Sequence, residues 1–127
     1  MDKAAMVSME LARGFELLEA LDHAKVKVAV ALWVLSSDYE DWRLYISARQ
    51  FDRLDLREAY GLIHKALDPA GFNAANTPPI IILRMTDPFI KELRRYFGKT
   101  TSAEGTRLGP QMFGNRFVED AYVYRVS

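Results

Sequence analysis

The sequence predicts an α+β fold with about three helices and a mostly antiparallel sheet. The expected order is helix, strand, strand, helix, strand, helix, strand, strand. Three observations predict it: three segments repeat apolar residues at helical spacing, the segments between them have strand patterns, and turn residues occupy nearly every junction. The chain has 127 residues, half of them hydrophobic, which suits one globular domain. We therefore expect residues 1–127 to form a single domain with its helices on one face of the sheet.

The first predicted helix covers residues 8–22. Its apolar residues recur at three- and four-residue steps, which places them on one stripe facing a core. Gly14 lies inside this helix, where glycine is unfavourable, and it predicts either close packing or a bend at that point. The stripe consists of Val7, Leu11, Phe15, Leu18 and Leu21.

Two strands are predicted next, and we expect them to pair. Residues 26–35 are rich in valine and leucine, as in a strand buried on both faces, and Trp33 is expected in the core. Residues 42–48 alternate in side-chain character instead. Because the polar residues 36–41 between them are typical of a turn, the two strands should form an antiparallel hairpin.

The second predicted helix begins after Asp55. Asp55 is a favourable N-cap residue, and Glu58 stands three residues later, as in a capping box. The helix should end at residues 69–71, which contain proline and glycine, and a loop should follow over residues 72–79. Its predicted buried stripe consists of Leu56, Tyr60, Ile63 and Leu67.

Residues 80–83 are the strongest interior strand candidate, because all four are isoleucine or leucine. A third helix should follow, with Thr86 or Asp87 as its cap and Pro88 in its first position. Gly98 is the expected C-terminal cap. The apolar residues of this helix are Phe89, Ile90, Leu93, Tyr96 and Phe97.

The last segment, residues 105–126, predicts two strands separated by a turn at Gly114 and Asn115. We expect the other glycines of this segment to form turns and a β-bulge. Asp120 interrupts an apolar face of the second strand and should lie either at an edge or in a pair. That face consists of Val118, Tyr122, Tyr124 and Val126.

Three segments of the chain, residues 14–22, 41–46 and 117–125, resemble a family of small uncharacterised bacterial proteins. In this sequence they read GFELLEALD, DWRLYI and FVEDAYVYR. The resemblance spans most of the chain at similar spacing. It implies a bacterial, cytosolic protein of one domain, and it implies no particular reaction, cofactor or catalytic residue.

The composition excludes several kinds of chemistry. The chain has no cysteine, so it forms no disulfide and has no thiolate nucleophile or cysteine metal ligand. Its two histidines, His23 and His64, have no partner at a spacing typical of a triad or a metal motif, and we interpret them as surface or satisfied core residues. No phosphate loop is present. The sequence therefore predicts neither a metal nor a cofactor, and it disfavours an enzyme.

We expect a cytoplasmic protein that does not enter a membrane. The most apolar run, residues 28–35, is much shorter than the roughly 20 residues of a membrane helix. The first residues lack the basic and apolar regions of a signal peptide.

Basic residues gather toward the end of the chain. The formal net charge is zero, but residues 1–83 contain 9 basic and 12 acidic residues, and residues 84–127 contain 8 and 5. If the glycine-rich turn folds back beside the end of the third helix, the cations there could bind an anion or a nucleic acid. The neutral chain as a whole disfavours a dedicated nucleic-acid binder. This basic cluster consists of Arg94, Arg95, Lys99, Arg107 and Arg116.

A second candidate surface is aromatic. Tyr39, Trp42 and Tyr45 lie at the predicted hairpin and could form an exposed patch for a partner protein or a second copy of the chain. The favoured hypothesis is thus a non-catalytic protein-interaction module that self-associates or binds another protein. Anion or nucleic-acid binding through the basic cluster is the alternative. A small enzyme is a third hypothesis, since carboxylates distant in sequence could meet in the fold.

Overall fold

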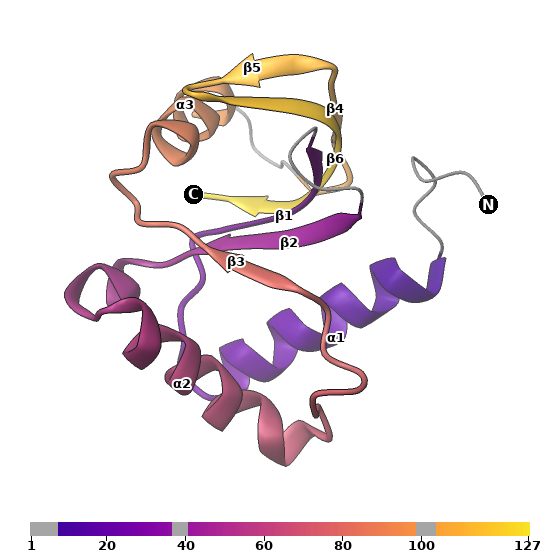
Figure 1. Cartoon of the computed structure of the whole chain (residues 1–127), viewed down its shortest axis with the longest axis vertical. Coiled ribbons are helices and arrows are strands. Elements are labelled where there is room, and N and C mark those ends of the chain that lie inside the picture. Colours follow the sequence, from indigo (N-terminus) through magenta and orange to yellow (C-terminus); the bar gives the residue numbers. More distant parts are fainter. Residues whose placement is uncertain (1–7, 37–40, 99–103) are drawn as a thin grey trace.

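The computed structural model describes residues 8–36, 41–98 and 104–127. Three α-helices surround a six-stranded sheet, with two short 3-10 helices in the connections (Figure 1). The α-helices are α1 (Ser8–His23), α2 (Leu56–Leu67) and α3 (Pro88–Phe97), and the 3-10 helices are η1 (Arg49–Arg53) and η2 (Asp68–Ala70). The strands are β1 (Val30–Ser36), β2 (Trp42–Ser47), β3 (Ile80–Ile82), β4 (Arg107–Leu108), β5 (Gln111–Phe113) and β6 (Arg116–Val126).

The predicted α+β class and the mostly antiparallel sheet are confirmed. The element order differs at its end, where three strands follow α3 instead of two. Gly109 causes the extra break, because its backbone has a φ of 112°, which turns the chain between β4 and β5. A side chain at this position would overlap the backbone of Glu119 in β6, so only glycine allows the two segments to lie so close.

The sheet has the strand order β3-β2-β1-β6-β4, and β5 pairs with β6 beyond that path. The β1–β2 hairpin is antiparallel as predicted, whereas β3 pairs parallel to β2. The prediction of an interior position for β3 was wrong, because β3 is an edge strand. The residues of β3 are all apolar because both faces of the strand are covered. Ile80 and Ile82 pack on one side of the sheet, and Ile81 packs on the other.

Helices cover both faces of the sheet, so the prediction that they share one face was wrong (Figure 1). The first face lies under α1 and α2, and the second lies under α3. The burial of β1 shows the reason, since all seven of its residues are buried. Its side chains alternate between the two cores, with Ala31, Trp33 and Leu35 in the first and the intervening valines and leucine in the second.

The face predicted for the last strand was also wrong. Tyr122 and Tyr124 pack in the first core, whereas Val118 and Val126 pack in the second. The pairing of β6 with β1 shifts register at two points, between Ala31 and Leu32 and between Leu35 and Ser36. Each such bulge adds one residue to β6 and therefore moves the following side chains to the opposite face.

A hydrogen-bonded pair of aromatic side chains joins α1 to the sheet. Trp33 Nε1 donates to the Tyr124 hydroxyl over 2.7 Å, and that hydroxyl donates to the carbonyl oxygen of Leu11 over 2.7 Å. Burial raises the pKa of Tyr124 to about 12. Gly14 lies directly on the Tyr124 ring. Of the two predictions for this glycine, close packing is therefore the one confirmed. Phe15, predicted in the core, is 41% exposed.

The predicted caps of the other helices are confirmed. Asp55 Oδ1 accepts from the Glu58 backbone, and Glu58 Oε1 accepts from the Asp55 backbone, so α2 begins with a full capping box. Asp87 caps α3, with Pro88 in the first position. Leu56, which was expected in the buried stripe of α2, is 61% exposed instead, and Tyr96 of α3 is 56% exposed.

Candidate functional site

The predicted basic cluster is not gathered in one place. Arg94 and Arg95 lie on α3, on the second face of the sheet. Arg107 lies on the first face, where its guanidinium is 5.9 Å from the ring of Trp42. Arg116 lies 4.0 Å from Asp87, at the opposite end of α3 from Arg94 and Arg95. Lys99 falls outside the described residues.

The described members of this cluster already have partners. Arg95 forms an ion pair with Glu92 over 2.7 Å, and Arg107 forms one with Asp120. Arg94 Nε donates to the carbonyl oxygen of Ser127 over 3.0 Å. The pairing of Asp120 confirms one of the two positions predicted for it. A joint role of the basic cluster in anion binding stays a prediction.

The predicted aromatic patch is not exposed where the structure describes it. Trp42 is 7% exposed and belongs to the first core, and Tyr45 is 1% exposed and belongs to the second. The two side chains point to opposite faces because they are an odd number of residues apart in one strand. Tyr39 falls outside the described residues.

The structure instead contains a groove between α1 and α2. The two helices run antiparallel on the first face of the sheet. Arg13 in α1 donates to the carbonyl oxygen of Asn76, beyond the end of α2, over 3.3 Å. Lys25, just after α1, accepts from Gln50, before α2 begins, over 3.2 Å. The groove therefore follows both helices over the same stretch.

The groove has a volume of about 520 Å³ and is open to solvent. Its floor consists largely of small side chains, because alanine recurs at a four-residue step on each side. Charged side chains form the rim. The floor contains Ala20, Ala24, Ala66, Ala70, Pro69 and Phe72, and the rim contains Glu16, Glu19, His23 and Lys65. None of these residues was predicted as a site; the paired alanine steps were the signal in the sequence.

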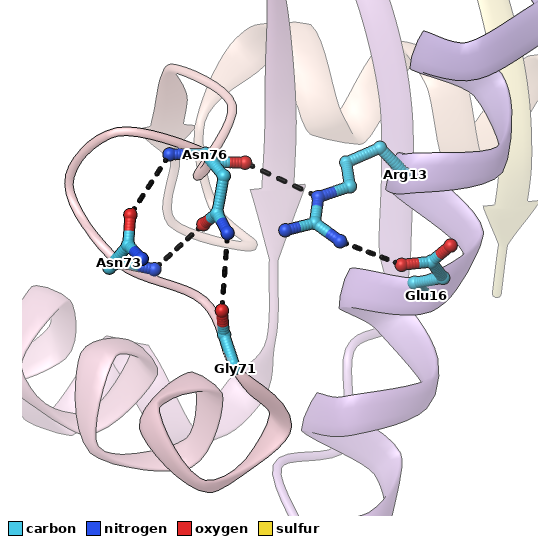
Figure 2. A network of polar contacts seen from close by, with 5 residues as sticks. All are labelled: Arg13, Glu16, Gly71, Asn73 and Asn76. Atoms are coloured by element: carbon cyan, nitrogen blue, oxygen red, sulfur yellow. Dashed lines mark hydrogen bonds and ion pairs between the residues drawn. The ribbon is translucent and has the colours of Figure 1, made fainter.

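The loop after Phe72, which lines one end of the groove, is held by its own side chains (Figure 2). The Asn76 side chain accepts from the Asn73 backbone over 2.7 Å and donates to the Gly71 carbonyl over 3.1 Å. Asn73 Oδ1 accepts in return from the backbone of Asn76. These bonds fold the loop on itself, as asparagine side chains commonly do in turns.

Arg13 fixes this loop to α1. Its guanidinium lies 4.1 Å from the centre of the Phe72 ring, a cation–π contact. It also donates to Asn76 and forms an ion pair of 2.8 Å with Glu16 (Figure 2). Arg13 therefore joins α1 to the loop at the Phe72 end of the groove.

The two ends of the groove differ in charge. Glu16 and Glu19 lie toward the end that Phe72 lines, whereas His23 and Lys65 lie toward the other end. The side chains of Glu19, His23 and Lys65 form no hydrogen bond or ion pair with any residue that the structure describes. Their polar atoms are thus available to a ligand in the groove.

The groove shows no assembled catalytic pair. His23 and His64 are both exposed, which confirms the surface interpretation for each. Within residues 8–36, 41–98 and 104–127, no three histidine or carboxylate side chains come together in a way that could hold a metal ion. The arrangement can bind through shape and charge.

No helix in the described part of the chain has the length and apolar character needed to cross a bilayer. Comparisons of the chain with protein-family models, with curated proteins and with solved structures give no match.

Proposed function

We propose that this protein is a non-catalytic interaction module that binds an amphipathic helix of a partner protein in the groove between α1 and α2. The observation that supports it best is the alanine floor. Small side chains on two neighbouring helices leave a channel into which the apolar stripe of a third helix can pack, a common mode of peptide recognition.

The size of the groove favours one helix over a second copy of the chain. From Glu16 to Ala24, just past the end of α1, the groove extends over eight residue steps, or about 12 Å, which is two helical turns. Its lining is much smaller than the roughly 20–30 residues that each side of a stable protein interface contributes. A short helix therefore fits, and its binding should be weak and reversible.

Charge complementarity sets the direction of the bound helix. Acidic residues of the partner should lie near His23 and Lys65, and basic residues near Glu19, since Glu16 is already paired with Arg13. A helix is more stable with acidic residues in its first turn and basic residues in its last turn. The partner helix should accordingly run parallel to α2 and antiparallel to α1.

Two synthetic helical peptides test this proposal. Both carry an alanine and leucine stripe; one has an acidic first turn and a basic last turn, and the other has the charges exchanged. We expect the first to bind at least about tenfold more tightly in fluorescence anisotropy, a difference of about 1.4 kcal/mol. Equal binding of the two peptides would contradict the proposed site.

A matched pair of variants locates the binding. Ala70→Trp fills the groove and should weaken binding of the first peptide by about tenfold or more. Ala12→Trp places the same side chain on an exposed position of α1 outside the groove and should leave binding unchanged. Circular dichroism shows whether each variant is folded. A folded Ala70→Trp variant with undiminished affinity would contradict the proposal.

A further inference from the structure

A basic surface lies at the end of the molecule where α1 ends and η1 begins. Three segments distant in sequence meet there. The Gln50 side chain of η1 accepts from the Lys27 backbone over 2.6 Å and donates to the Lys25 carbonyl over 3.2 Å. Arg84, after β3, donates to the carbonyl oxygens of Asp52 and Leu54 over 2.6 and 3.3 Å. We call the cations of these segments the η1 surface: Lys25, Lys27, Arg49, Arg53 and Arg84.

The cations of the η1 surface are not neutralised. All five are exposed, and none forms an ion pair with a residue that the structure describes. Three other arginines of the chain, Arg13, Arg95 and Arg125, each lie within 3 Å of a carboxylate, whereas Arg57 and Arg94 form no ion pair with a residue that the structure describes. Within η1 the carboxylate is Asp52, whose Oδ1 is held by the Met85 backbone over 3.1 Å. Asp52 and Asp55 are the acidic residues of the η1 segment, so the five cations leave the η1 surface with a net positive charge.

Lys25 occupies a position that normally belongs to glycine. The Val26 and Lys25 amides donate to the carbonyls of Leu21 and Asp22, which ends α1 in a Schellman motif. Lys25 takes the left-handed position of this motif with a φ of 67°, and it is the non-glycine residue with positive φ in the described part of the chain. A side chain there strains the backbone, and strained residues gather at functional sites. The chain therefore holds a lysine at a position where glycine would fit with less strain.

Side-chain bonds to the backbone also preorganise the η1 surface. Gln50 holds the segment of Lys25 and Lys27 in place, and Arg84 ties the turn after η1. Arg49 and Arg53 are then held on one short helix about 8 Å apart along its axis. A ligand binding here does not have to order the chain.

We propose that the η1 surface binds the phosphate backbone of a nucleic-acid duplex. Arg49 and Arg53 carry guanidinium groups that match phosphate oxygens in a bidentate fork, whereas Arg84 bonds backbone carbonyls and adds its charge. None of the three segments carries an exposed aromatic ring of the kind that stacks on unpaired bases, since Phe51 in η1 is 2% exposed. The contact is therefore to phosphates and independent of base sequence. This proposal does not depend on the proposed binding of a helix in the groove between α1 and α2.

The test measures binding of the full chain to a fluorescent DNA duplex of about 20 base pairs at several salt concentrations. With five phosphate contacts, the logarithm of the affinity should fall against the logarithm of the salt concentration with a slope of about −4.5. Arg49→Gln with Arg53→Gln should reduce the steepness of that slope by about 2. The matched control, Arg95→Gln with Arg107→Gln, removes two exposed arginines elsewhere and should change neither slope nor affinity.

Lys25→Gly separates binding from folding. Glycine relieves the strained backbone, so this variant should melt at a higher temperature than the original chain while binding the duplex several-fold more weakly at low salt. A gain of stability together with a loss of affinity would show that the charge, and not the fold, is what the variant removes.

Three outcomes overturn the proposal. The first is duplex affinity that is unchanged in both Lys25→Gly and the Arg49 and Arg53 variant. The second is an equal loss in the Arg95 and Arg107 control. The third is tight binding of another anionic ligand, either polyglutamate or vesicles of phosphatidylcholine and phosphatidylserine. If that binding is as tight as duplex binding and is weakened equally by the Arg49 and Arg53 variant, the surface serves an acidic protein or a membrane.

Discussion

At the scale of single residues, the attachment of α1 depends on one hydroxyl group and one missing side chain. The Tyr124 hydroxyl accepts from Trp33 and donates to Leu11, so it satisfies a buried indole N–H and a helix carbonyl at once. The ring reaches this position because Gly14 leaves room for it. The helix thereby gains packing and hydrogen bonds that offset the unfavourable intrinsic propensity of glycine.

Gly14→Ala should therefore lower the free energy of unfolding by about 1–3 kcal/mol, because the new methyl group overlaps the Tyr124 hydroxyl and displaces it. Urea denaturation measures the change. Gly61→Ala is the matched control inside α2, where a methyl group meets no atom within 4 Å. That variant should raise the free energy of unfolding by about 0.5–1 kcal/mol through helix propensity. If both substitutions stabilise the protein, the close contact at Gly14 is not rigid.

At the scale of elements, the edge strand β3 is protected by a side chain from α2. Pro79 and Leu83 bond to β2, so the carbonyl of Ile80 and the amide of Ile82 point away from the sheet. The Tyr60 hydroxyl bonds both, donating to Ile80 over 3.1 Å and accepting from Ile82 over 3.3 Å. It occupies the place that another strand would take. Exposed edges of this kind otherwise promote pairing between molecules.

Tyr60→Phe should lower the free energy of unfolding by about 1–2 kcal/mol, because two backbone groups lose their partner. It should also cause a concentration-dependent rise of the mass measured by light scattering, since the edge of β3 becomes free to pair. A variant that is destabilised while its mass stays constant at all concentrations would show that the hydroxyl stabilises the edge without protecting it.

At the scale of the whole molecule, one sheet separates two cores. Because β1 contributes alternate side chains to each, neither core can lose its packing without exposing the other side of the same strand. We therefore expect unfolding in a single transition. The two cores also leave the outer side of α1 and α2 free for the groove, while the ends of the strands bring the η1 surface together.

Ile63→Val and Ile90→Val test this arrangement. Ile63 in α2 is fully buried in the first core, and Ile90 in α3 is fully buried in the second. Each substitution should lower the free energy of unfolding by about 0.5–1.5 kcal/mol. The double variant should show the sum within about 0.5 kcal/mol, because the side chains lie on opposite faces of the sheet and share no contact. Two separate unfolding transitions in either variant would contradict a single cooperative unit.

Local sequence patterns determined most of the elements and their ends. The caps at Asp55 and Asp87 and the antiparallel hairpin follow from short-range rules, because each depends on residues within a few positions of one another. The burial of β1 on both faces could also be predicted from the sequence, since its run of apolar residues leaves no polar face.

Tertiary structure alone decided the faces of β6, the edge position of β3 and both proposed binding surfaces. Two bulges in the pairing with β1 set which tyrosines and valines share a core, and a bulge depends on the partner strand as much as on the strand itself. The η1 surface joins Lys25, Arg49 and Arg84, which are separated by long stretches of chain. Periodicity reports the environment of each residue along its own element, whereas a binding surface depends on which elements become neighbours, and packing decides that.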